Sequence, residues 1–156
     1  MATIQGTILL SLAGLVHVPY NPVLIVTLLG ELALTAFTLT CIGVLVASRM
    51  EQVESFQVVM QLFVLPMFFL SGAVFPLSDL PRWLEVLTRI DPLSYAVDAI
   101  RRAMFAHIRV GAAASAFTRP LAWGGRALPV GLELGIVAAI GLAMLGGAIA
   151  QFSRAE

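Results

Sequence analysis

The sequence contains no lysine, and all nine of its basic residues are arginines. The phosphate-binding loop of P-loop ATPases ends in a lysine followed by serine or threonine, so this chain cannot form that loop. Any ATP hydrolysis coupled to it must therefore take place on another protein. Nine acidic residues balance the nine arginines to a net charge of zero, which gives no electrostatic basis for binding nucleic acid.

Cysteine and histidine are also scarce. The one cysteine, Cys41, lies in an apolar run and has no partner for an internal disulfide, so we expect it to pack as a small apolar side chain. The two histidines, His17 and His107, are not spaced as a metal-binding pair. Serine, aspartate and histidine form no recognisable catalytic-triad motif. The sequence therefore predicts no catalytic residue, no metal site and no bound cofactor.

Charge of either sign is rare, at 12% of the residues, whereas 60% are hydrophobic and the mean hydropathy is +0.97. Soluble domains carry about 25% charged residues. A water-soluble fold of this size cannot hide so much apolar surface, and lipid is the solvent that fits. We therefore predict an all-α integral membrane protein.

Four stretches approach the roughly 20 apolar residues that a transmembrane helix needs. They are residues 4–18, 23–47, 56–75 and 130–152. The two prolines in Pro19–Pro22 predict a tight turn, so the first two stretches form a hairpin. A short polar loop, residues 48–55, leads into the third.

Two short helices are expected between the third and fourth stretches. In residues 81–90, the side chains of Trp83, Leu84, Leu87 and Ile90 share one face of an amphipathic helix. Asp91 then caps a second helix over residues 92–107.

The second short helix begins with Pro92, which is favoured at a first helical position. Asp98 is spaced to pair with Arg101 or Arg102 on this helix. The residues that follow, 108–129, are rich in alanine, glycine and arginine and predict an irregular connector.

Four motifs occur in order between Gln57 and Phe105. They read Leu70-Ser-Gly-Ala-Val-Phe-Pro76, Leu80-Pro-Arg-Trp-Leu84, Asp91-Pro-Leu-Ser-Tyr-Ala96 and Ala99-Ile-Arg-Arg102. This series resembles the C-terminal part of the ABC-2 family, the permease subunits of ABC exporters, and most closely its daunorubicin-resistance and nodulation branch. Asp91 stands where the family usually has asparagine, and both residue types cap helices.

The resemblance implies a function and partners. Family members typically have six spans, and this chain looks like spans three to six, which favours a fragment, a mis-called start or a degraded gene copy. The implied function is a multi-pass permease in the inner or plasma membrane that exports a drug, lipid or polysaccharide-like substrate. The implied partners are an ABC ATPase subunit that binds the ATP, a second permease copy and membrane lipid.

The motif residues are expected to form an outer gate. Gly72 and Pro76 should break the third span near the membrane surface, after which the two short helices turn back toward the bilayer as a re-entrant plug. The residues assigned to this gate are Ser71, Gly72, Phe75, Pro76, Pro81, Trp83, Asp91, Pro92, Tyr95 and Arg101.

Three polar residues within the spans are candidates for the translocation path. Glu31 lies inside the second span, where an acid is costly. It lines the path or pairs with an arginine, or else it is protonated or solvated near the surface. Gln57 and Gln61 share a face of the third span and either line the path or join helices by hydrogen bonds.

Two further features have alternative interpretations. Arg49, Glu51 and Glu54, in the polar loop, either contact the ATPase subunit or are ordinary solvated charges. In the fourth span, small residues recur at every fourth position and predict close helix packing. They are Gly131, Gly135, Ala139, Ala143 and Gly147.

The orientation of the chain has conflicting indications. Seven arginines lie between the third and fourth spans, against Arg49 and Arg154 on the other side, so the positive-inside rule places that segment in the cytoplasm. The family resemblance places it outside, and we adopt this orientation because nearby acids largely balance those arginines. Two other functional classes are alternatives to a permease. One is a membrane scaffold or assembly subunit without transport. The other is a membrane-embedded enzyme, for which the sequence offers no nucleophile or metal cluster.

Overall fold

The computed structural model describes residues 4–8, 21–50, 52–73, 82–106, 122–123 and 126–153. Its helices are α2 (Pro22–Ala47), α3 (Val53–Leu70), α4 (Arg82–Ile90), α5 (Pro92–Phe105) and α6 (Val130–Phe152), and residues 4–8 are also helical. The strands β1 (Ala122–Trp123) and β2 (Arg126–Ala127) form a two-residue antiparallel ladder. The described part of the connector is therefore a small hairpin rather than wholly irregular.

Three helices, α2, α3 and α6, are long and apolar enough to cross a membrane, which confirms the prediction of an all-α membrane protein. Of the span expected at residues 4–18, residues 9–18 lie outside the described part of the chain.

The third span differs from its predicted bounds. It begins three residues earlier, at Val53, and its first turn includes Glu54, which interacts favourably with the positive end of the helix dipole. It ends at Leu70 instead of Phe75, because Gly72 follows with a positive φ of 73°. A residue in that conformation closes the last helical turn and cannot continue the helix.

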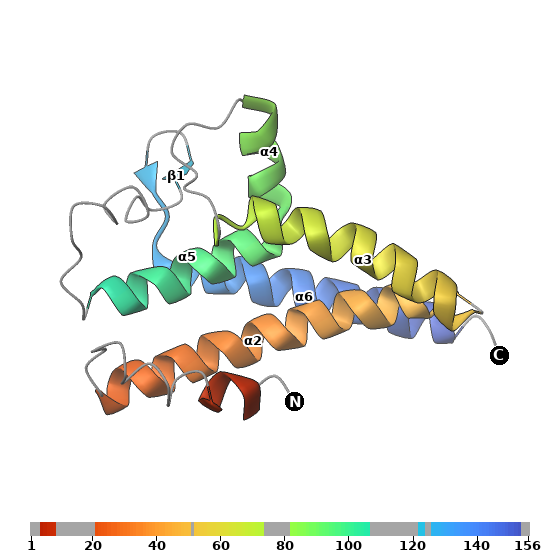
Figure 1. Cartoon of the computed structure of the whole chain (residues 1–156), viewed down its shortest axis with the longest axis horizontal. Coiled ribbons are helices and arrows are strands. Elements are labelled where there is room, and N and C mark those ends of the chain that lie inside the picture. Colours follow the sequence, from red (N-terminus) through yellow and green to blue (C-terminus); the bar gives the residue numbers. More distant parts are fainter. Residues whose placement is uncertain are drawn as a thin grey trace.

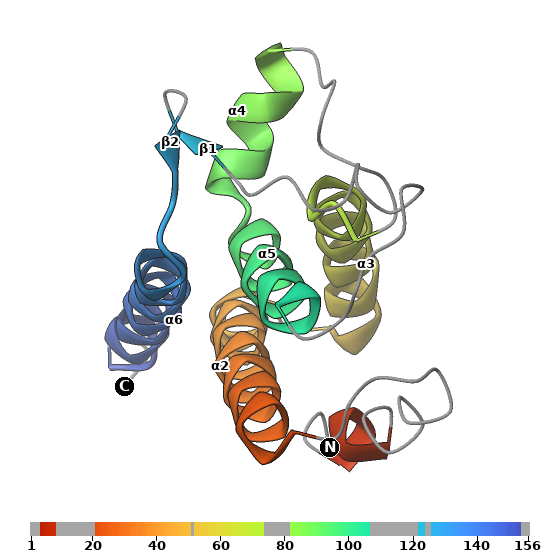
Figure 2. The same cartoon turned by 90° about the vertical axis from the view of Figure 1, so that its left-hand side faces the viewer.

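The spans form a bundle in which α2 and α6 lie side by side and run in the same direction (Figure 1). Helix α5 lies against both of them and also contacts α3 (Figure 2). At 14 residues, α5 is about 21 Å long, too short for a bilayer core of about 30 Å. It lies alongside α2 and α6, and its re-entrant placement in the bilayer stays a prediction.

Helix α4 behaves differently from α5. It projects away from the bundle (Figure 1), and its apolar residues Trp83, Leu87 and Ile90 are exposed. The two short helices expected to turn back together thus have separate positions, because only α5 presents small and polar residues that fit between the spans.

The contact between α2 and α6 depends on one glycine. A Cβ atom at Gly141 would lie 2.8 Å from the Thr38 Oγ1 atom and 3.3 Å from its Cα atom, so the two helix backbones approach closely here. Thr38 also donates a hydrogen bond of 3.0 Å to the carbonyl of Val137.

The stripe of small residues predicted from the sequence does not include Gly141, and only its last member is shown against α2: a Cβ atom at Gly147 would lie 3.4 Å from the Leu45 side chain. All five of its members are exposed within this chain, and Gly131 and Gly135 face open space. Glycine and alanine occur on several faces of α6, so a four-residue period does not identify the packed one.

Candidate functional site

The end of α3 is tied to α5 through the carbonyl of Gly72. Ser71 is buried, and its hydroxyl donates to the carbonyl of Phe68 at 2.7 Å. The carbonyl of Gly72 accepts a hydrogen bond from the Arg101 guanidinium. Two residues predicted for the gate, Gly72 and Arg101, therefore meet at one joint between helices that are 21 residues apart in sequence.

The first turn of α5 is built around Asp91. Its carboxylate caps the helix by accepting a bond of 3.0 Å from the amide of Leu93, and Pro92 occupies the first helical position. The Ser94 hydroxyl lies 2.9 Å from the second Asp91 oxygen and 3.1 Å from the carbonyl of Leu70.

A serine hydroxyl carries only one hydrogen, so Ser94 cannot donate fully to both acceptors. Ser94 donates to Asp91 in the structure; when Asp91 binds a proton, its carboxyl can donate to Ser94 instead, and the Ser94 hydrogen is then available to Leu70. Burial raises the pKa of Asp91 to about 6, although the bonds from Leu93 and Ser94 oppose this shift. Asparagine, which has its own donor, would satisfy the same geometry at every pH.

The remaining residues predicted for the gate do not lie together. Tyr95 is 1% exposed, and its hydroxyl donates to the carbonyl of Arg89 at 2.5 Å, which fastens α5 to the end of α4. Trp83 is exposed on α4, apart from this joint. The side chains of Phe75, Pro76 and Pro81 lie outside the described residues.

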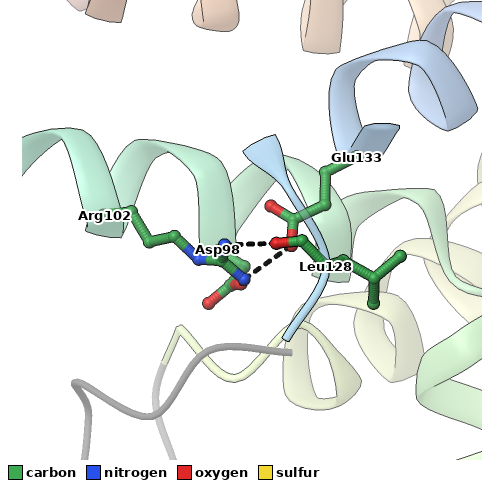
Figure 3. A network of polar contacts seen from close by, with 4 residues as sticks. All are labelled: Asp98, Arg102, Leu128 and Glu133. Atoms are coloured by element: carbon green, nitrogen blue, oxygen red, sulfur yellow. Dashed lines mark hydrogen bonds and ion pairs between the residues drawn. The ribbon is translucent and has the colours of Figure 1, made fainter. Parts of the chain in front are cut away.

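Arg102 organises a second polar cluster, between α5 and α6 (Figure 3). One of its terminal nitrogens lies 2.6 Å from Asp98 and 2.8 Å from Glu133. The other donates to the carbonyl of Leu128 at 2.5 Å. Of the two partners that the sequence allows for Asp98, Arg102 forms an ion pair with it at 2.6 Å, and Arg101 also interacts with its charge.

Buried carboxylates accumulate around Arg102. Asp98, Glu133 and Glu31 are 4%, 0% and 3% exposed, and both Asp98 and Glu31 lie close enough to Glu133 to act on its charge. The Oε2 atoms of Glu31 and Glu133 have no hydrogen-bond partner among the described residues. Glu31 is thus enclosed by protein, and the alternative of solvation at the surface does not hold in this structure.

The other residues selected from the sequence lie elsewhere. Gln57 and Gln61 are exposed on α3, none of whose residues is buried. Arg49 is exposed and donates to the side chain of Gln151 at 2.9 Å, which links the end of α2 to the end of α6. Glu54 is exposed, and Glu51 lies outside the described residues. The roles of all five stay predictions.

Sequence reasoning missed Ser94 and Glu133. Glu133 had a usable signal, because an acid in a membrane span is a functional candidate wherever it occurs, and the rule that selected Glu31 applies equally to it. Ser94 is 0% exposed, but a serine in a helix has no sequence pattern that indicates its burial.

The described geometry therefore holds a short helix between spans by polar contacts to α3, α4 and α6. The chain also shows a clear relationship to known proteins: residues 1–105, about two thirds of its length, match the profile of the ABC-2 type transporter. This chain belongs to the ABC-2 type transporter family. Members of that family are membrane components of transporters and are not themselves catalytic enzymes.

Curated relatives agree with this assignment. Nodulation protein J of Sinorhizobium fredii and that of Rhizobium meliloti are each 38% identical over 76 residues, which cover 49% of this chain and 29% of theirs. Nodulation protein J of Rhizobium leguminosarum bv. trifolii is 36% identical over 79 residues, which cover 51% of this chain and 30% of that protein. The chain thus spans less than a third of the length of these relatives. No solved structure gives a significant match.

Proposed function

We propose that this ABC-2 chain is a permease subunit of an exporter in the inner or plasma membrane and is driven by a separate ABC ATPase. The observation that carries the proposal is the position of α5. It is a buried helix too short to span, held to the end of α3 by Arg101 and to α6 by Arg102. These polar contacts can open and close as units, which a gate requires.

We assign different roles to the two ends of the bundle. The α2–α3 loop and the C-terminal end of α6 lie at one end, opposite the start of α6 (Figure 1). We assign Arg49, Glu51 and Glu54 at this end to contact with the ATPase. The joint around α5 serves as the outer gate, and Glu31, Gln57 and Gln61 belong to the path. The exported substrate is drug-like, lipid or polysaccharide-like, and a second permease copy completes the path.

Transport into everted membrane vesicles tests the proposal. The chain is co-expressed with the ABC ATPase subunit of its own organism, and three probes are offered: a fluorescent anthracycline, a fluorescent short-chain phospholipid and a labelled oligosaccharide. We expect ATP-dependent accumulation of one probe. It should be lost when the phosphate-loop lysine of the ATPase is replaced by alanine.

A scaffold or assembly role is the competing proposal, and one observation favours it. None of the residues of α3 is buried, so this helix is free to contact other membrane proteins. If the chain co-purifies with the ATPase but no probe accumulates, and vesicles from cells lacking the chain behave identically, the scaffold role replaces export.

A further inference from the structure

The bundle contains an imbalance of buried charge around Arg102. Helices α2 and α6 each carry one charged residue, Glu31 and Glu133, and both are acidic. Helix α5 adds Asp98, Arg101 and Arg102. The described elements therefore bring three carboxylates and two guanidinium groups together.

Among the side chains that the structure describes, no other charge corrects this imbalance; the side chains of Arg82 in α4 and Arg126 in β2 are not among them. Helix α3, which packs on α5, carries only Glu54, exposed in its first turn. Arg89 of α4 is already paired with Glu85 at 2.6 Å. With every group ionised, the cluster has one excess negative charge inside a membrane bundle, where the desolvation of a carboxylate is strongly unfavourable.

The geometry identifies where the excess charge lies. Arg102 approaches one oxygen of Glu133 at 2.8 Å, and no donor among the described residues reaches the other oxygen, Oε2. The Asp98 carboxyl is also within hydrogen-bonding reach of Glu133, and two carboxyl groups form such a bond only when one of them carries a proton. Glu31 likewise has a buried Oε2 atom that no donor among the described residues reaches. A bare carboxylate oxygen in this position costs far more free energy than a protonated one.

We propose that the cluster of Glu31, Asp98 and Glu133 binds one proton, carried on a carboxyl oxygen of Glu31 or Glu133. The proton is taken from water, converts one carboxylate to a neutral carboxylic acid and leaves two carboxylates facing two guanidinium groups. The two glutamates are 3% and 0% exposed, so both carboxyl groups are removed from bulk water. The described residues also contain no group of three His, Cys, Asp or Glu residues arranged to hold a metal ion.

This inference does not depend on transport. It predicts that the closed contact between α2, α5 and α6 is formed by the protonated cluster, and that loss of the proton weakens it through repulsion between like charges. A carboxylic acid and a carboxylate absorb at different infrared frequencies, and the acid band shifts in heavy water, so the proton can be observed directly.

Infrared spectra of the whole chain in detergent, recorded at about neutral pH, test the proposal. Asp91→Asn serves as the background, because Asp91 is itself buried and titratable. We expect an acid band equivalent to one carboxyl group per chain. The band should disappear in both Glu31→Gln and Glu133→Gln, since either change leaves two carboxylates for two guanidinium groups. Glu54→Gln, at the exposed start of α3, is the matched control and should retain the band.

Several results would overturn the proposal. One is the absence of the acid band from the background protein, because a proton then does not neutralise the cluster. This holds even if added sodium ions stabilise the protein, since a cation would then be the neutralising group. Persistence of the band in either glutamine variant also overturns it, because the acid then lies elsewhere or is independent of the charge count. If a variant fails to fold by circular dichroism, the spectrum of the background protein still decides the question.

Discussion

At the scale of single residues, Asp91 combines a structural role with an unfavourable charge. Its carboxyl caps α5, yet burial raises its pKa from the ordinary value of 3.8 to about 6. The folded state therefore binds the proton more tightly than the unfolded state does. The stabilisation is complete below about pH 4 and is lost as the pH rises through about 6.

Asp91→Asn should remove this pH dependence. Asparagine keeps the acceptor for Leu93 and supplies a donor to Ser94. Relative to the variant, the native chain should lose about 2 kcal/mol of unfolding free energy between about pH 4 and about pH 7. Unfolding in mixed micelles, followed by circular dichroism across this range, measures the difference. Parallel curves for the two proteins would contradict the assignment.

Position 72 requires glycine because of its backbone conformation. The sequence predicted that Gly72 breaks the third span, and the structure gives the reason, a φ of 73°. Gly72→Ala should therefore cost about 1 kcal/mol of stability. Gly30→Ala is the control, because Gly30 is exposed in α2 with open space around it. Equal effects of the two changes on unfolding would mean that the left-handed conformation is unimportant.

At the scale of helices, the α2–α6 contact depends on Gly141. Gly141→Ala should destabilise the chain by about 1–3 kcal/mol, because its Cβ atom would clash with Thr38. Gly135→Ala, on an open face of the same helix, should have little effect. Adding Thr38→Ala to Gly141→Ala removes the closest atom, so the double variant should lose less than the sum of the two single changes. Strict additivity would rule out this contact.

Arg102 connects α5 to α6 and partly neutralises two buried acids. Arg102→Gln leaves Asp98 and Glu133 without their cation, and we expect a loss of about 3 kcal/mol. Arg89→Gln is the matched control. It breaks an exposed pair with Glu85, at 38% and 50% side-chain exposure, and should cost under about 1 kcal/mol. Thermal unfolding of both variants measures the two losses of stability. Similar losses would contradict this expectation, because they would mean that the ion pairs of Arg102 are as well solvated as the exposed pair of Arg89.

At the scale of the whole molecule, the topology can be measured with single cysteines after Cys41→Ala. Trp83→Cys, at an exposed position on α4, should react with an impermeant thiol reagent added to intact cells. Arg49→Cys, at the other end of the bundle, should react only after the membrane is permeabilised. The reverse pattern would follow the positive-inside rule and place α4 and α5 on the ATPase side, as coupling elements rather than an outer gate.

Local features of the fold were predictable from the sequence. The membrane class follows from composition, and the start of α5 follows from Asp91 and Pro92, because caps and proline act within one helical turn. The end of α3 was predicted five residues late, since the apolar run continues past Gly72 and composition does not show where the backbone changes conformation.

The sequence by itself determined that the chain spans a membrane, where most helices begin, and that Glu31 is an unfavourable charge requiring explanation. Only the tertiary structure decided which polar groups meet. Glu31 and Glu133 are remote in sequence and approach each other because α2 and α6 pack side by side at Gly141. Helix rotation and crossing determine such encounters, and in an apolar helix with small residues on several faces, the sequence leaves that rotation undetermined.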